Sequence, residues 1–204
     1  MGRLATLLLL LTACKGTTTP VQEPKPKPVL VVIEVAEPET EVEAQGKPWR
    51  PETNKLPPAF APRMPVGVEE LRFAPGMFTV GAPDYWSYVF VLRLRDKFAG
   101  TDRLTKLIEH YYVGLISTVA ANRERDLTRA PAKVSLEALG KNRYRAKIDL
   151  IDVFVTGKPV LLNLDLSLVD RNDGTYVLVA ASPQPRTHAI WRSMAHLLKK
   201  LAAK

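Results

Sequence analysis

The sequence predicts an α+β fold in which helices pack on one antiparallel sheet. Several runs of strand length alternate apolar and polar residues, and two longer segments carry apolar residues at helical spacing. Short separators containing Gly, Asn and Asp join the strand-like runs, which favours antiparallel neighbours because parallel strands need a long crossover. The predicted order of elements is β-β-α-β-β-β-β-α, in a single domain over residues 66–204.

The clearest strand before the first helix is Trp86–Arg95. Its even-numbered residues are apolar, whereas Arg93 and Arg95 fall on the opposite face, and this alternation indicates a half-buried strand. Met77–Val80 lies just upstream, beyond a turn that contains Gly81 and Pro83. We therefore predict that Met77–Val80 pairs with this strand as a hairpin.

A long helix is predicted from Thr101 to about Asn122. Thr101 and Asp102 are both good N-cap residues. Its apolar residues recur at helical spacing and predict one buried stripe. The stripe comprises Leu104, Leu107, Ile108, Tyr111, Leu115 and Val119.

Four further strands are predicted over residues 133–139, 143–155, 159–170 and 175–181. The parity of the apolar residues changes near Leu150 and Ile151, which predicts a β-bulge there. A last helix follows Pro185 and is capped by Thr187. Its expected buried residues are Ile190, Met194, Leu197, Leu198 and Leu201.

One long helix between a hairpin and a four-strand meander resembles the hotdog fold in its element order, over Met77 to Ala181. The thioesterase relatives of that fold bind acyl chains between sheet and helix, so the resemblance implies an acyl-ligand site. No active-site motif of that family accompanies the order of elements. Another α+β roll, such as a cystatin-like one, fits the same order.

Residues 14–65 are predicted to form a linker that is disordered and rich in proline. Eleven of the chain's 17 prolines lie between Pro20 and Pro65, among many charges and few aromatic residues. Such a composition buries too little apolar surface to offset the entropy of ordering the chain. Val29–Val35 is the exception, since its β-branched run either stays disordered like the rest or pairs as a strand with this domain or with a protein partner. Three apolar residues are candidates to dock the end of the linker: Trp49, Phe60 and Met64.

The first fourteen residues carry the pattern of an export signal. Arg3 precedes the uncharged run Leu4–Cys14, whose eleven residues are too few for a membrane span of roughly 20 residues. Leu-Thr-Ala-Cys at the end of this run resembles the lipobox of bacterial lipoproteins. The resemblance implies cleavage before Cys14 and lipidation of its thiol. Lys15 then favours the outer membrane, facing the periplasm, if the source is Gram-negative.

The distribution of charge predicts a second kind of contact, with an anionic partner. From residue 66 onward the chain has 21 Lys and Arg against 14 Asp and Glu. Alternation places Arg143, Arg145 and Lys147 on one strand face, and Arg93 and Arg95 on another. If these strands share a sheet, they form a basic face for an anionic envelope polymer or lipid head groups. Nucleic acid is not expected as a partner outside the cytoplasm.

Catalytic residues are harder to find. His110 could pair with Asp149 or Asp152, but the spacing does not require the hydrogen-bond contact that acid–base chemistry needs. Asp152, together with Thr156 and Lys158, is the most site-like group. The polar-face Asp165 is a further strand carboxylate. The sequence has no zinc-ligand cluster and no phosphate-binding glycine loop, so we expect no cofactor and no metal.

Three functions remain open after the sequence alone. The first is a non-enzymatic, membrane-tethered binding or structural module of the cell envelope. The second is a hotdog-like acyl-ester hydrolase that uses Asp152 or His110 as its base. The third is an assembly factor whose Val29–Val35 strand pairs with a partner sheet. A filled core with an open basic face would favour the first function.

Overall fold

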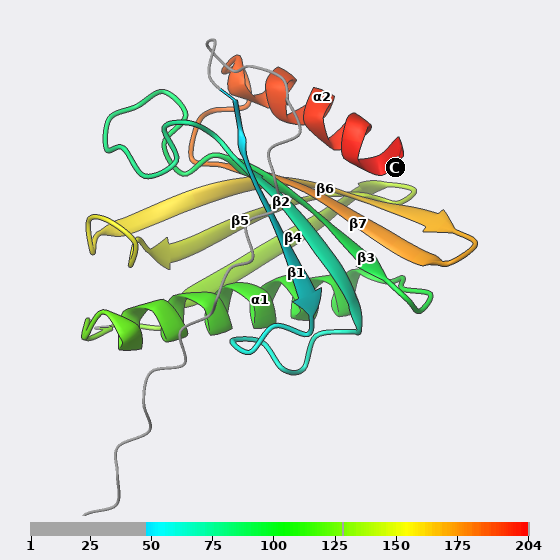
Figure 1. Cartoon of the computed structure of the whole chain (residues 1–204), viewed down its shortest axis with the longest axis horizontal. Coiled ribbons are helices and arrows are strands. Elements are labelled where there is room, and N and C mark those ends of the chain that lie inside the picture. Colours follow the sequence, from blue (N-terminus) through cyan, green and yellow to red (C-terminus); the bar gives the residue numbers. More distant parts are fainter. Residues whose placement is uncertain (1–47, 128, 204) are drawn as a thin grey trace, which may run out of the picture. The chain divides into compact units, whose positions relative to one another are not determined.

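The computed structural model describes residues 48–127 and 129–203, and it confirms the α+β class with one antiparallel sheet. Within these residues, seven strands lie in the order β1-β2-β3-β7-β6-β5-β4, with α1 on one face and α2 on the other (Figure 1). The strands are β1 Arg50–Leu56, β2 Gly67–Phe73, β3 Tyr88–Leu94, β4 Ala132–Gly140, β5 Arg143–Ile151, β6 Pro159–Arg171 and β7 Gly174–Ser182. The helices are α1 Thr101–Asn122 and α2 Ile190–Ala203.

The predicted order of elements is confirmed from β2 to α2, and β1 precedes it. The hairpin partner of β3 was placed wrongly, because Met77–Val80 forms turns and β2 is the strand that pairs with β3. The Asp84 carboxylate accepts a hydrogen bond from the Gly76 amide, at 2.9 Å, and holds the segment between β2 and β3 as a folded loop. Here local hydrogen bonds, rather than a strand ladder, satisfy the backbone.

The folded region begins earlier than the predicted boundary at Pro65. Residues 50–56 form β1, which pairs along its whole length with β2. The expected docking of Trp49 and Met64 is found, since both are buried, and the ring of Phe60 packs edge-on against Tyr111 of α1. The backbone there approaches α1 so closely that a Cβ on Gly114 would lie 2.0 Å from the Phe60 carbonyl oxygen. Val29–Val35 and Cys14 lie outside the described residues.

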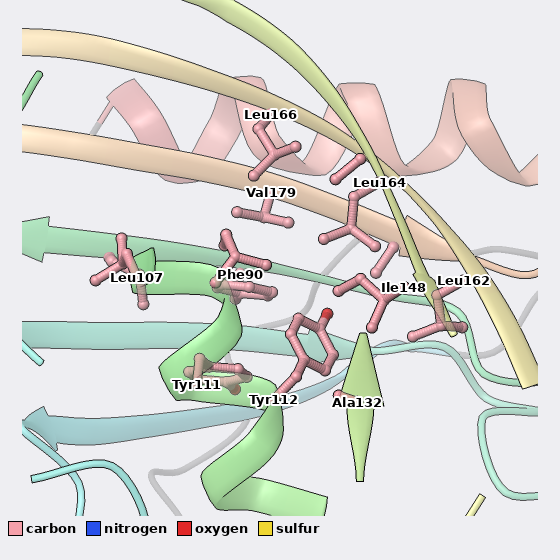
Figure 2. Packing of buried hydrophobic residues seen from close by; sticks show 14 of the residues in the cluster. Phe90, Leu107, Tyr111, Tyr112, Ala132, Ile148, Leu162, Leu164, Leu166 and Val179 are labelled. Atoms are coloured by element: carbon pink, nitrogen blue, oxygen red, sulfur yellow. The ribbon is translucent and has the colours of Figure 1, made fainter. Parts of the chain in front are cut away.

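Two apolar cores lie on opposite faces of the sheet. The larger fills the space between α1 and the sheet, and Figure 2 shows Tyr111 and Tyr112 of α1 close to Phe90 of β3. The smaller lies under α2 and includes Val89 and Val91 of β3. Strand β3 is therefore buried on both faces, whereas the sequence predicted a half-buried strand.

Helix α1 has the predicted bounds but a rotated apolar stripe. Leu115 and Val119 are only partly buried, whereas residues of the adjacent row are buried more deeply. The N-cap is Gly100, with no side-chain hydrogen bond, instead of Thr101 or Asp102. The fully buried additions are Tyr112, Ile116 and Ala120.

The predicted bulge near Leu150 is wrong. Strand β5 pairs regularly with β6 up to Ile151 and then ends, so the change of parity marks a loop rather than an extra residue. The irregularity in this part of the sheet lies in β4, between Ala138 and Gly140. Helix α2 buries Trp191 more completely than the predicted Leu198.

Candidate ligand-binding face

Half of one sheet face is open and polar. Helix α2 covers β3 and β7 on this face and reaches one end of β6 at Val169, but it leaves β4 and β5 uncovered (Figure 1). Because strand side chains alternate, Arg143, Arg145 and Lys147 of β5 all point to this face, opposite α1, and all are exposed. The grouping of these three residues agrees with the sequence prediction.

Two arginines share one carboxylate at the centre of this open half. The Arg145 Nε lies 3.5 Å from the Asp165 Oδ1, and the Arg186 guanidinium contacts the same oxygen. Arg186 also donates to the Leu164 carbonyl at 3.0 Å and lies over the ring of Trp191. Two positive charges on one negative charge leave a surplus that an anion can neutralise.

A shallow hollow of about 380 Å³ lies beside this group. Among the described residues, Lys147 and Arg143 form no ion pair, so their charges face solvent. The only carboxylate that lines the hollow is that of Glu137. The lining residues are Ser135, Glu137, Arg145, Ala146, Lys147 and Arg186.

Asp149 lies at the border of the same face. Arg129 donates two hydrogen bonds to its carboxylate, at 2.6 and 2.7 Å. These bonds hold the pKa of the Asp149 carboxyl below its ordinary value and raise the pKa of the Arg129 guanidinium. Asp149 is therefore already satisfied and adds no free negative charge to the open half.

Arg93 and Arg95 do not join this group, because β7 and β6 separate β3 from β5. The Arg93 guanidinium binds Glu70 at 3.0 Å and the carbonyl of Leu201 in α2 at 3.3 Å. Arg95 is exposed just beyond the end of β3. The predicted basic face is thus divided, and only its β5 part lies on an open surface.

The hydrogen bonds of Asp152 hold the loop over residues 152–158 in shape. Its carboxylate is buried and accepts five hydrogen bonds, and its backbone amide donates to the Lys158 carbonyl at 2.8 Å. Burial alone would raise the pKa of the Asp152 carboxyl, but the hydrogen bonds outweigh it and the pKa is lowered. The donors are the amides of Phe154, Val155 and Thr156 and the hydroxyls of Thr156 and Tyr85.

Asp152 is therefore poorly placed to act as a base. All its acceptor sites are occupied from within the protein, and a lowered pKa makes it a weaker proton acceptor. Burial and the bond to Asp152 raise the pKa of Tyr85 to about 12, so Tyr85 stays protonated at neutral pH. Within the described residues, His110 forms no hydrogen bond with Asp149 or Asp152.

One titratable group that the sequence analysis missed lies in the large core. Glu69 of β2 is only 1% exposed, and the Asn54 amide of β1 donates to it at 3.1 Å. Burial raises its pKa to about 7, although hydrogen bonds with Tyr111 and Asn54 lower it in part. In a strand, Glu69 points to the same face as Leu71 and Phe73, so recognising β2 as a strand would have placed Glu69 in the core.

Two absences apply to the part of the chain that the structure describes. No group of three or more His, Cys, Asp and Glu residues in it could hold a metal ion. Neither α1 nor α2 is both long enough and apolar enough to cross a membrane.

Comparison with known proteins gives no relative for this arrangement. The resemblance to the hotdog fold therefore still depends on the order of elements alone. No family model, no curated protein and no solved structure matches this chain.

Proposed function

We propose that this protein is a lipid-anchored binding module of the cell envelope, which holds an anionic ligand on the open half of its sheet. One observation carries the binding part of the proposal, namely that Arg145 and Arg186 share the single carboxylate of Asp165. Lys147 and Arg143 add positive charge alongside them. Phosphate and carboxylate groups suit such a cluster, because guanidinium binds both in a bidentate fashion.

The anchor is proposed from the sequence. Lipidation at Cys14 would place the domain in the cell envelope, where lipid head groups and anionic polymers present these groups. Between Cys14 and Pro48 there are 33 residues, which can span at most ~110 Å. The ligand is therefore expected within that distance of the membrane, which favours an envelope component over nucleic acid.

Two features support binding rather than hydrolysis. The side chains between α1 and the sheet fill the larger core, and Leu104, Ile108 and Ile116 of α1 are fully buried there. An acyl chain in a hotdog-like mode would need this space. Asp152, which the hydrolase alternative uses as a base, is saturated with hydrogen bonds from its own loop.

The anion site is tested by removing charge from β5. We expect Arg145→Gln combined with Lys147→Gln to weaken binding of inorganic polyphosphate or polyglutamate to the full-length chain about a hundredfold, measured by titration calorimetry. The estimate takes about 1.4 kcal/mol for each lost charge-assisted contact. Comparing the two polymers also separates a phosphate ligand from a carboxylate ligand.

The matched control is Lys199→Gln combined with Lys200→Gln on the exposed side of α2. This pair removes the same net charge, and both lysines are exposed. A site on β5 requires that the α2 variant keep nearly all its affinity. Equal losses in both variants would contradict a defined site and indicate only attraction to net charge.

The anchor has a separate test. We expect a Cys14→Ser precursor to lose incorporation of radiolabelled fatty acid and to move from the membrane fraction to the soluble fraction, because no other thiol can accept the lipid. Variants of β5 must leave this fractionation unchanged. Absence of label from the parent chain, or labelling that Cys14→Ser leaves unchanged, would refute the anchor.

A further inference from the structure

A second exposed surface lies on the loop between β2 and β3, at the end of the sheet where β3 begins. The loop between β2 and β3 carries ten consecutive uncharged residues, 74–83. At its tip, which we define as Phe78–Val80, the Phe78 side chain is 43% exposed and that of Val80 is 60% exposed. Such exposure of two large apolar side chains on one loop indicates a contact surface.

The tip is held in place by the loop's own hydrogen bonds. Successive turns bond the Thr79 amide to the Gly76 carbonyl and the Ala82 amide to the Thr79 carbonyl, at 2.9 and 3.1 Å. The Phe78 ring packs against Phe73 and Phe154. The two apolar side chains are therefore presented on a loop that its own turns and ring contacts hold in shape.

Three arginines without carboxylate partners among the described residues lie on this tip and on the Phe154–Val155 segment, whose Phe154 ring packs against it. Arg50 lies over the ring of Phe78, with its guanidinium carbon 5.6 Å from the ring centre. Arg123 donates to the Phe154 carbonyl, and Arg125 donates to the Val155 carbonyl at 3.1 Å. Within the described residues none of the three forms an ion pair.

We propose that the Phe78–Val80 tip inserts into the surface of an anionic lipid bilayer, with Arg50, Arg123 and Arg125 at the level of the lipid phosphates. Apolar side chains at a tip with basic groups behind it match the two layers of a membrane interface. Glu124 and Asp126 lie near Arg123 and Arg125 in sequence, so apolar insertion contributes more than net charge. The proposal rests on the anchor at Cys14, which would keep a bilayer within reach of the tip.

The experiment measures the depth of the tip in a membrane. The lipidated full-length chain with Thr79→Cys is labelled with an environment-sensitive dye and reconstituted into phosphatidylcholine–phosphatidylglycerol vesicles that contain a lipid-borne quencher. Because the Cys14 thiol is consumed by lipidation, the dye attaches only at position 79. A Leu139→Cys label is the matched control, since Leu139 is 44% exposed. Leu139 lies in β4 beside the start of β5, whereas Phe154 follows the end of β5.

We expect blue-shifted emission and several-fold stronger quenching at position 79 than at position 139. Adding Phe78→Ser and Val80→Ser should remove this difference while the chain stays on the vesicles. Equal, weak quenching at both positions in the attached chain would overturn the proposal and leave the tip to a protein partner. A precursor that takes up no lipid would contradict the anchor instead, and adding the labelled Cys14→Ser, Thr79→Cys chain to the same vesicles then tests the tip alone.

Discussion

Replacing Trp49 with alanine should lower the free energy of unfolding by about 3–5 kcal/mol, although Trp49 lies in the region that the composition predicts to be a linker. Its side chain is 1% exposed and packs in the core under α2 with Ala74, Val89 and Met194. Truncation removes a large apolar surface and leaves a cavity. Chemical denaturation monitored by circular dichroism measures the change, and the melting temperature should fall by roughly 10 °C.

The matched control is Trp49→Phe. Among the described residues, the Trp49 Nε1 atom is buried without a hydrogen-bond partner, so phenylalanine removes an unsatisfied donor while keeping most of the apolar contact. We expect this variant to lose about 1 kcal/mol or less. If Trp49→Ala unfolds at the same denaturant concentration as the parent chain, Trp49 is not part of the folded domain.

Replacing Glu69 with glutamine should stabilise the protein at pH 8 and leave its stability nearly unchanged at pH 4. The folded-state pKa of Glu69 is raised from 4.5 to about 7 because burial disfavours its carboxylate. The protonated group therefore supports folding fully below pH 4.5, and this contribution is lost as the pH rises to about 7. Glutamine resembles the protonated acid, so the expected gain above pH 7 is roughly 2–3 kcal/mol.

The measurement is a series of denaturation curves between pH 4 and pH 8 for the parent chain and the variant. The difference between the two chains carries the result, because every other titratable group is common to both. Glu70→Gln is the control, because Glu70 is the next residue of β2 and pairs with Arg93 on the other face. The Glu70→Gln variant should keep the pH dependence of the parent chain. If the stability of the Glu69→Gln chain changes with pH in parallel with that of the parent chain, burial does not raise the pKa of Glu69.

The sequence predicts the second half of this fold well because β4 to β7 carry their own pattern. In β6, Leu162, Leu164 and Leu166 alternate with polar residues, so burial on one face is visible locally. Strand β1 has no such pattern, since Leu56 is its only large apolar residue. It forms a strand because β2 pairs with it, which is a tertiary interaction that the local sequence does not show.

The candidate site, too, could be predicted from the sequence only in part. Alternation along β5 is enough to place Arg145 and Lys147 on one face. The contribution of Arg186 could not be predicted, because it comes from the segment before α2 and reaches Asp165 only in the folded chain. Alternation alone does not separate Arg93 from these two residues, because the sequence does not reveal that β6 and β7 lie between β3 and β5.

The pairing of β3 with β7 has a consequence for the order of folding. The sheet consists of two local meanders, β1–β3 and β4–β7, and this pair joins them. Its partners are between 81 (Leu94 and Thr175) and 93 (Tyr88 and Ala181) positions apart, so closure costs about 4 kcal/mol in chain entropy. Until that step, each meander exposes the edge of an apolar strand, and such edges pair readily with other chains. The interval before β7 meets β3 is therefore when the chain is most prone to aggregate.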